Sequence, residues 1–358
     1  MPDINQVARN ATDPGIAATF FIGEENRTQK IPVHFSEFRG SSVHKIFIFA
    51  HQAFAQSISQ SKSGPMKKPK FFAAVFLLFL LFPGVFSQQL PKSGHPFRLV
   101  SYNIRYDNPN DGDNTWANRS ERVANLLRFH KANIFCLQEA LLNQIEDLQA
   151  EFPEFEYYGV GRDDGKIKGE FCPVFYDAGR FEKTDYGTFW LSETPKKPGS
   201  TGWFATLPRI TSWVKFRDKA TGNLFFVFNT HLDHASETAR DKGSELIMQK
   251  ITEICNGLPV ILCGDFNAKP GTEPYNNVVN NGKQNIQMFD ARMAAESPHH
   301  GPTFTFVGWD FTGVPGNIID YIFINPTVKV IRHVILGDNY DGIYPSDHLP
   351  VLIEAKIE

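Results

Sequence analysis

Apolar runs of strand length alternate with amphipathic stretches of helix length from Phe97 to the C-terminus. Short apolar or alternating runs predict β-strands, while apolar residues that recur every three to four positions predict helices. Strands are expected over 97–104, 133–140, 170–177, 188–192, 210–218, 223–233, 258–267, 317–325, 328–336 and 348–357. Helices are expected from near Asn118 to 132, over 141–152 and over 238–256.

Strands outnumber helices, and segments rich in Gly and Pro, such as 193–202 and 297–303, separate the elements. This ratio favours two stacked β-sheets with helices on their outer faces, because each sheet must bury a face against another layer. The chain shows no internal repeat. We therefore expect one α/β domain over residues 97–358.

Residues 66–87 have the pattern of a secretory signal peptide. Met66 is followed by a basic start, a 12-residue apolar run over 71–82, and the small residues Val85 and Ser87 before a cleavage point. The run is short for a membrane span, which needs about 20 residues, and it lacks the amphipathic face of a core helix. We expect export to the periplasm or the extracellular space. A membrane anchor formed by residues 71–82 is the alternative.

Residues 1–65 contain no motif that indicates a domain. Because signal peptides lie at the N-terminus, we hypothesise that translation starts at Met66 and that residues 1–65 are an over-extended reading frame. The alternative is a signal-anchor protein with a short cytoplasmic tail. Residues 88–96 are expected to be a linker to the domain over residues 97–358.

Charge and cysteine content limit the classes of function. After residue 87 the chain carries 27 Lys or Arg and 34 Asp or Glu, a net charge of −7. It therefore lacks the basic footprint with which proteins hold long nucleic acids, so phosphate recognition must be local. The even number of cysteines permits disulfides, but Cys136 and Cys263 lie in apolar runs that favour buried free thiols.

Polar residues recur directly after apolar strands. In α/β folds such strand ends at one edge of the sheet bind ligands, although each residue alone could also be a cap or a surface charge. Oxygen ligands without cysteine favour Mg²⁺ or Mn²⁺, and carboxylates with histidines suit the hydrolysis of phosphate esters. The residues concerned are Asn103, Glu139, His231, Asp265, Asn267, Asp320, Asp347 and His348.

Five short motifs occur in one order along the chain: QE at 138–139, NTH at 229–231, GDFN at 264–267, IDYIF at 319–323 and SDH at 346–348. Together they resemble the endonuclease/exonuclease/phosphatase superfamily, in the form of an exported bacterial-type member. The resemblance extends from Phe97 to the C-terminus. It implies the DNase I-like fold, a four-layer α/β/β/α sandwich, and a divalent metal cofactor, Mg²⁺ or Mn²⁺.

The resemblance also implies roles for the strand-end residues. Glu139 matches the main metal-binding glutamate, assisted by Asn103 and Asp347. Asp265 matches the carboxylate that orients or deprotonates the attacking water, and Asn267 helps to hold the phosphate. The remaining catalytic matches are His348 and His231, which contact the phosphate, and Asp320, which orients His348.

Residues near these motifs are candidates for binding the rest of the substrate. Arginine suits phosphate because its planar guanidinium donates two parallel hydrogen bonds. Trp116 could stack on a base or a sugar ring, or it could fix its loop to the core. The candidates are Arg105, Trp116, Arg119, Arg162, Glu170, Arg209 and Arg240, and Asp113 shares the loop of Trp116.

We expect a secreted, metal-dependent hydrolase of phosphate esters, in the first place a phosphodiesterase or nuclease. One alternative is a phosphomonoesterase acting on sugar phosphates or phospholipid head groups. An alternative of another class is a catalytically inactive exported binding protein, against which the complete set of motif residues argues. The expected partner is a phosphate-ester substrate; no obligate protein partner is indicated, and a monomer is expected.

Overall fold

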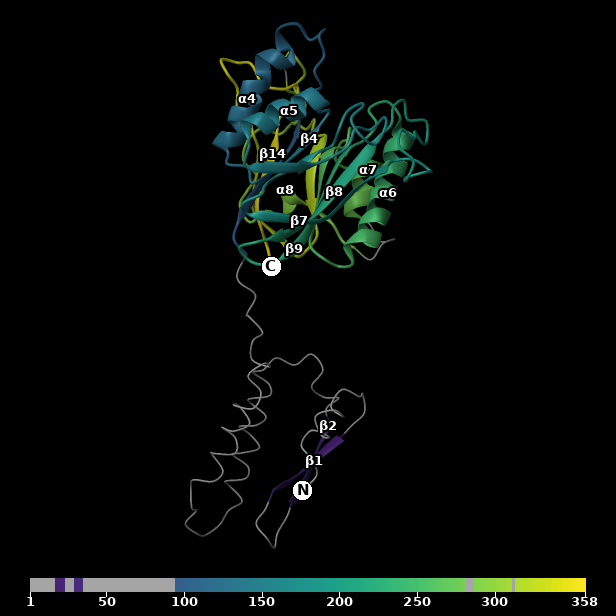
Figure 1. Ribbon diagram of the computed structural model, residues 1–358, viewed down its shortest axis with the longest axis vertical. Helices are drawn as coiled ribbons and strands as arrows, with labels where there is room; N and C mark the ends of the chain where they lie inside the picture. The colour runs from purple at the N-terminus through teal and green to yellow at the C-terminus, as the bar shows by residue number, and fades with distance from the viewer. Residues whose placement is uncertain (1–16, 23–28, 35–93, 281–285, 311–312) are drawn as a thin grey trace. The chain divides into compact units, whose positions relative to one another are not determined.

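The computed structural model of the protein describes residues 17–22, 29–34, 94–280, 286–310 and 313–358 (Figure 1). The chain divides into two units, Met1–Gln88 and Gln89–Glu358. In the first unit, β1 (Ala17–Ile22) pairs antiparallel with β2 (Gln29–His34). The expected signal peptide over 66–87, and most of the linker, lie outside the described residues. Among the residues that are described, no helix is long and apolar enough to cross a membrane.

The second unit contains two six-stranded sheets. The order in one sheet is β13 (Val328–Ile335), β14 (Val351–Ile357), β3 (Phe97–Asn103), β4 (Ile134–Gln138), β6 (Val174–Asp177) and β5 (Phe155–Tyr158). The order in the other is β11 (Phe289–Asp290), β12 (Asp320–Ile324), β10 (Val260–Asp265), β9 (Leu224–His231), β8 (Ile210–Asp218) and β7 (Phe181–Trp190). Within these sheets the pairs β3–β4 and β9–β10 are parallel, and the other pairs are antiparallel.

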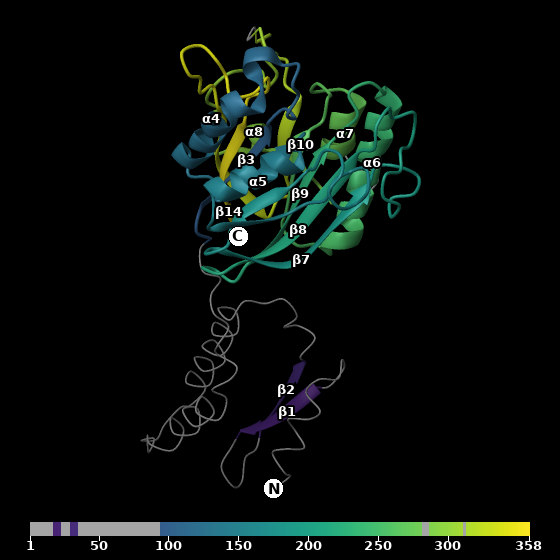
Figure 2. The same ribbon diagram turned by 45° about the horizontal axis from the view of Figure 1, so that its top comes forward.

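Helices cover the outer face of each sheet (Figures 1 and 2). α4 (Trp116–Phe129) and α5 (Leu142–Glu151) lie on the sheet that contains β3, and α6 (Glu237–Cys255) and α7 (Glu273–Val279) lie on the sheet that contains β10. The short elements η2 (Gly112–Asn114) and α8 (Ala291–Ala294) lie in connections. The expected four-layer α/β/β/α sandwich is therefore confirmed.

Central strands bury both faces because each lies between the other sheet and a helical layer. In β4, Ile134 and Cys136 face the core between the sheets, while Phe135 and Leu137 face the core beneath α4 and α5. The period of two along the strand produces this division. β10 follows the same rule, with Ile261 and Cys263 toward the core between the sheets. These buried strands hold the site residues at their ends.

Most expected elements occur, with shifts at their ends. α4 begins at Trp116, two residues before Asn118, and the strand expected over 348–357 is regular only from Val351. β7 extends from Phe181 to Trp190, so it begins well before the expected 188–192. Its first part was not predicted because several side chains of this edge strand are exposed and leave no clear apolar pattern. β5, α7, α8 and β11 were not expected. All four cysteines are buried free thiols, which confirms that expectation for Cys136 and Cys263.

Candidate active site

The ends of four strands bring the expected site residues to one edge of the sandwich. Asn103, His231 and Asp265 are the last residues of β3, β9 and β10, and Glu139 follows β4. Because β3–β4 and β9–β10 are parallel pairs, each pair ends at one edge of its sheet. Asp320 begins β12, which runs antiparallel to β10, so it lies directly opposite Asp265. The hydrogen bonds described next show that both sheets contribute to one site.

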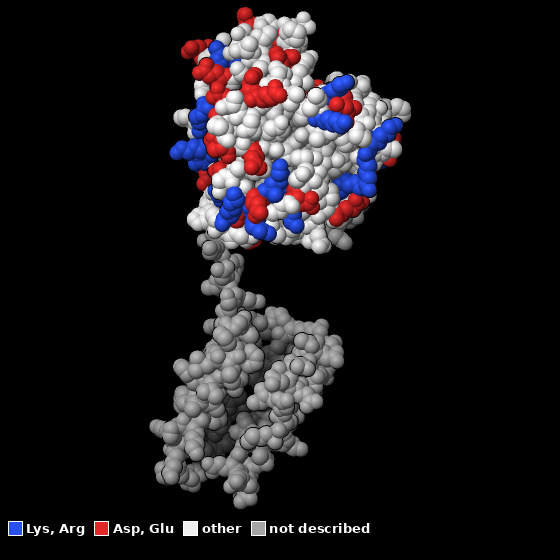
Figure 3. All heavy atoms as spheres, in the orientation of Figure 1, with Lys and Arg blue, Asp and Glu red and all other residues white. Residues whose placement is uncertain are grey.

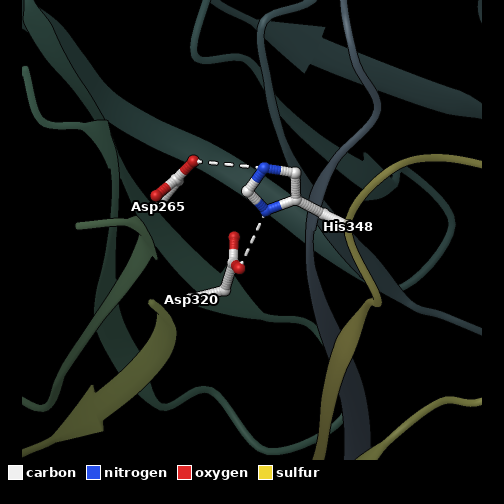
Figure 4. Close-up of side chains that lie close together, drawn as sticks. All are labelled: Asp265, Asp320 and His348. Atoms are coloured by element: carbon white, nitrogen blue, oxygen red, sulfur yellow. Dashed lines mark hydrogen bonds and ion pairs between the residues drawn. The ribbon is translucent and has the colours of Figure 1, made fainter. Parts of the chain in front are cut away.

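His348 lies between two buried carboxylates (Figure 4). Its Nδ1 atom is 2.9 Å from Asp320 Oδ2, and its Nε2 atom is 3.8 Å from Asp265 Oδ2. Burial alone would lower the pKa of His348, but the charges of Asp320 and Asp265 outweigh it and raise that pKa well above its usual value. Burial, together with the charge of Asp320, raises the pKa of Asp265 to about 7. The two carboxylates therefore favour the protonated form of the ring.

The side-chain amide of Asn103 connects this group to Glu139. Asn103 Nδ2 donates to Glu139 Oε1 at 3.0 Å and to Asp265 Oδ2 at 2.9 Å. The other carboxylate oxygen of Glu139 accepts from the backbone N–H of Tyr106 at 3.2 Å. Glu139 has a left-handed backbone with φ of 59°, a strained conformation that is concentrated at functional sites. The position of its carboxylate is thus fixed by several contacts.

Glu139 and Asp347 together offer hard oxygen ligands that fit a divalent cation. Burial raises the pKa of Asp347, and the charge of Glu139 raises it further, so a cation would relieve the repulsion between them. Asp265, Asp320 and His348 also offer ligand atoms that lie within 4.8 Å of one another. The His348–Asp320 hydrogen bond already occupies ligand atoms of this group, which favours a role in proton transfer. Glu139 and Asp347 are therefore the better candidates for metal ligands.

His231 also lies near Asp265, with its Nε2 atom 3.6 Å from Asp265 Oδ2. Asn267 Nδ2 donates to Leu232 O at 3.2 Å and to His231 Nε2 at 3.1 Å, so Nε2 is the acceptor and Nδ1 carries the proton. His231 Nδ1 is 3.8 Å from Glu170 Oε2. Burial, followed by the charge of Arg209, lowers the pKa of His231 well below its usual value. This histidine is therefore neutral and presents an N–H toward the pocket beside it.

A small pocket adjoins His231 and is lined by Arg162, Glu170, Cys172, Arg209, Ile210 and His231. Arg162 donates from Nη1 to Glu170 Oε2 at 2.7 Å, and Arg209 Nη2 is 2.8 Å from His234 Nδ1. Within the described part of the chain, Arg162 Nε, Arg209 Nη1 and His231 Nδ1 are buried without hydrogen-bond partners. These donors suit an oxyanion, but the pocket is too tight to admit one as it stands, so the side chains that line it must move to let an oxyanion bind.

Two substrate-binding predictions need correction because the side chains point into the protein. Trp116 is 3% exposed, belongs to the core beneath α4 and α5, and donates from Nε1 to Asp147 at 2.7 Å. It fixes its loop to the core and has no free face for a base or a sugar ring. Arg119 is 2% exposed, and all its hydrogen bonds go to backbone carbonyls.

The remaining arginines differ in their availability. Arg240 donates from Nη1 to the carbonyls of Asp233 and His234 at 3.0 and 3.1 Å, so it supports a loop of the site. Arg105 forms a two-bond pair with Asp111, at 3.0 and 3.1 Å, and its Nη1 atom is 3.9 Å from Glu139 Oε2. Contacts of Arg105 and Arg209 with substrate remain predictions.

Two contributors to the site were not expected from the sequence. Thr305 Oγ1 accepts from the backbone N–H of Asp320 at 3.1 Å and thereby fixes the start of β12. The Phe306 ring packs edge-on against His348, with the ring centroids 5.0 Å apart. Both belong to segment 303–317, whose aromatic and polar composition was the only signal in the sequence.

Comparisons with known proteins agree with this geometry. The model of the Endonuclease/Exonuclease/phosphatase family matches residues 100–348. An endonuclease/exonuclease/phosphatase from Bacteroides vulgatus is 39% identical, with a TM-score of 0.70, over 74% of this chain and 100% of that one. The mannosyl-6-phosphatase of Bacteroides thetaiotaomicron is 37% identical, with a TM-score of 0.68, over 72% of this chain and 99% of that one.

A curated relative is more distant. The CCR4-Not complex 3'-5'-exoribonuclease subunit Ccr4 of Emericella nidulans is 24% identical over 68% of this chain and 48% of its own length. The chain spans about half the length of the curated relatives it matches. The family acts hydrolytically on phosphate esters, and its members are typically dependent on divalent metals. With its two sheets, their helical covers and the family match across residues 100–348, the chain belongs to the endonuclease/exonuclease/phosphatase family and has the DNase I-like fold.

Proposed function

We propose that the protein is a divalent-metal-dependent phosphomonoesterase that acts on sugar phosphates. The observation that carries this proposal is the group of donors without partners on Arg162, Arg209 and His231, which lies next to the catalytic candidates because His231 Nε2 is 3.6 Å from Asp265 Oδ2. A phosphomonoester carries a charge of about −1.5 to −2 and three strong acceptor oxygens at pH 7, which match several buried donors. Similarity to a mannosyl-6-phosphatase over 99% of that chain supports the same substrate class.

In the proposed reaction Asp265 accepts the proton of the attacking water. The water oxygen bonds to phosphorus while the bond from phosphorus to the sugar oxygen breaks, and that sugar oxygen takes a proton from solvent. Its Oδ1 atom accepts from the backbone N–H of Asn267 at 2.9 Å, and Oδ2 accepts from Asn103 at 2.9 Å, so both oxygens are held in place. A base is most effective when its pKa lies near the working pH, and the pKa of Asp265 is raised to about 7.

His348 and the metal ligands stabilise negative charge. The His348 ring, with Nδ1 donating to Asp320, can donate from Nε2 to an oxygen of the phosphoryl group. Glu139 and Asp347 would hold the divalent cation, with Asn103 fixing the carboxylate of Glu139. When bound, such a cation polarises the phosphoryl group and stabilises the charge that develops on its oxygens.

A phosphodiesterase or nuclease, the first expectation from the sequence, is the second candidate, and similarity to a 3'-5'-exoribonuclease favours it. The charge distribution favours the phosphomonoesterase. Acidic and basic side chains are mixed over the face in Figure 3, without one basic area across it. Proteins usually bind long nucleic acids through a continuous basic surface.

A substrate panel tests the proposal. The chain from residue 88 onward, with Mg²⁺ or Mn²⁺, should hydrolyse mannose 6-phosphate and p-nitrophenyl phosphate with kcat/KM at least about tenfold above that for bis-p-nitrophenyl phosphate or short oligonucleotides. The reverse order would favour the nuclease. The Glu139→Ala and His348→Ala variants should lose activity on every substrate, and wild-type rates in either would refute the site.

Export is also a proposal, since residues 66–87 lie outside the described structure. Cleavage after Ser87 is expected. Mass spectrometry of the native protein should find an N-terminus near Gln88, and any peptide from residues 1–60 would contradict a start at Met66. Light scattering on the purified protein should give the mass of a monomer, and a stable dimer would contradict the expectation that no partner is required.

A further inference from the structure

We infer that Arg119 is a positioning residue that holds two active-site segments, Ile104–Tyr106 and Pro345–His348, in register with each other. This inference rests on the proposed metal-dependent hydrolysis. Arg119 lies on α4, away from the reacting groups, and is 2% exposed. Within the described part of the chain, it has no carboxylate within 4.0 Å. Burying a cation costs free energy unless hydrogen bonds compensate it, so the partners of Arg119 indicate why it is buried here.

The guanidinium of Arg119 donates to consecutive carbonyls of the first segment. Nη1 donates to Ile104 O, and Nη2 lies 2.7 Å from Arg105 O and 3.5 Å from Tyr106 O. The N–H groups of the same segment bind the side chains of the metal site: Arg105 N donates to Asn103 Oδ1 at 3.0 Å, and Tyr106 N donates to Glu139 Oε2. Arg119 thus holds the carbonyls of peptides whose amides orient two expected metal-site residues.

The same guanidinium reaches the second segment. Nη1 also lies 3.2 Å from Pro345 O, and the next residue, Ser346, donates from Oγ to Asn103 O at 2.8 Å. Asp347 and His348 follow directly. Because one nitrogen of a rigid fork contacts both Ile104 O and Pro345 O, the spacing between the two segments is set by the geometry of that fork.

Three further contacts keep the guanidinium in place. Nε donates to Asn114 O at 2.9 Å, and the guanidinium carbon lies over the rings of Trp116 and Trp309 at 5.2 and 5.5 Å from their centroids. Arg105 has a left-handed backbone with φ of 56°, a conformation that persists in a residue other than glycine only where surrounding contacts impose it. Lysine could not reproduce this arrangement, because its ammonium has three donors and no fixed plane.

The test compares Arg119→Lys with Arg180→Lys. Arg180 is a matched control because it also binds backbone carbonyls, those of Pro96 and His95 at 2.8 and 2.7 Å, and lies over two aromatic rings. It lies near Phe97, at the end of β3 opposite Asn103.

Mn²⁺ binding to the metal-free chain from residue 88, measured by calorimetry, should be weaker by about tenfold or more in Arg119→Lys and within about twofold of wild type in Arg180→Lys. kcat should fall in Arg119→Lys more than KM rises, after correction for the folded fraction. Equal Mn²⁺ affinity and equal kcat in the two variants would overturn the inference, even if both lost stability.

A second variant covers the case in which Arg119→Lys does not fold. Trp309→Leu keeps every hydrogen bond of Arg119 and removes one ring of the stack, so Mn²⁺ affinity should fall by about threefold. Unchanged affinity in that variant would also overturn the inference. Failure of metal-dependent hydrolysis itself is distinguishable, because wild type would then neither bind Mn²⁺ nor hydrolyse any ester in the panel. A wild-type preference for diesters would contradict the phosphomonoesterase without affecting this inference.

Discussion

At the scale of single residues, the expected site residues form two groups with different proposed roles. In the proposed reaction the buried group of Asp265, Asp320 and His348 holds and moves protons, whereas Glu139 and Asp347 would supply oxygens for a cation. Asn103 connects them, because its amide donates to both Glu139 and Asp265. The division explains why one asparagine lies at the end of the central strand β3, where an apolar residue could not bridge two carboxylates.

The Asp320→Asn variant tests whether Asp320 acts in proton transfer or in metal binding. The change should lower kcat by about 10²-fold or more, because His348 loses the carboxylate that stabilises its charge and orients its ring. Mn²⁺ affinity, measured by calorimetry, should stay within about threefold of wild type. A loss of Mn²⁺ binding comparable to that in Glu139→Ala would instead make Asp265, Asp320 and His348 the metal site.

At the scale of elements, a pair of buried amides joins the two sheets beneath the site. Gln138 Nε2, at the end of β4, donates to Asn229 Oδ1 of β9 at 2.6 Å. Asn229 Nδ2 donates to the carbonyls of Leu137 and Pro173 at 2.8 and 2.9 Å. Since Glu139 follows Gln138 and His231 follows Asn229 by two residues, the bridge sets the separation of both halves of the site.

Asn229→Leu should lower the free energy of unfolding by about 3 kcal/mol, because it leaves several buried polar groups unpaired. Thr211→Val is the control: it removes one buried hydrogen bond, at 2.9 Å from Thr230, within a single sheet and should cost about 1 kcal/mol. Urea denaturation measures both. Equal losses of unfolding free energy would show that the bridge between the sheets contributes no more stability than an ordinary buried hydrogen bond.

A histidine pair between β13 and the segment that follows α8 should limit stability in acid. His299 Nε2 donates to Pro302 O at 2.9 Å, so its Nδ1 accepts from His333 Nδ1 at 3.0 Å. Burial, then the nearby His299 and Arg292, lowers the pKa of His333 to about 3. The folded state therefore requires neutral His333. Its stabilising effect is complete above the unfolded pKa of about 6.5 and is lost as the pH falls toward 3.

Between pH 7 and pH 5, wild type should lose about 1–2 kcal/mol more unfolding free energy than His333→Asn, which cannot be protonated. Urea denaturation at the two pH values measures this difference. Identical pH dependence in both proteins would show that His333 titrates normally. Carboxylates contribute equally to both proteins and cancel in the comparison.

At the scale of the whole molecule, charge distinguishes the two candidate functions. The net charge of −7 after residue 87 gives no general attraction for polyanions, so we propose that substrate binding depends on the few buried donors of the pocket. These donors lie away from bulk water and are screened less by salt than surface charges are.

The KM for mannose 6-phosphate should therefore change by less than about threefold between 50 and 200 mM salt. A protein that holds nucleic acid through many phosphates loses about 10³–10⁵ in affinity over that range. Steady-state kinetics at the two salt concentrations measure the effect. A steep salt dependence would favour a polyanionic substrate and the nuclease.

The amino-acid sequence by itself determined the layers and the strand-end residues. Apolar periodicity predicted β3, β4, β9 and β10. The motifs at their ends predicted Asn103, Glu139, His231 and Asp265, because a buried strand can place polar residues only where it ends at the edge of the sheet. Most of edge strand β7 and all of the short strand β5 were not predicted, since partial exposure removes the apolar pattern.

Only the tertiary structure decided whether the polar residues beyond those strands face substrate or the protein. Arg119 follows a polar loop and looks available for phosphate, yet its carbonyl partner Pro345 is 226 residues away along the chain. Trp116 likewise finds Asp147 on a different helix. Local composition cannot reveal such distant acceptors, because the direction of a side chain depends on what the folded chain brings beside it.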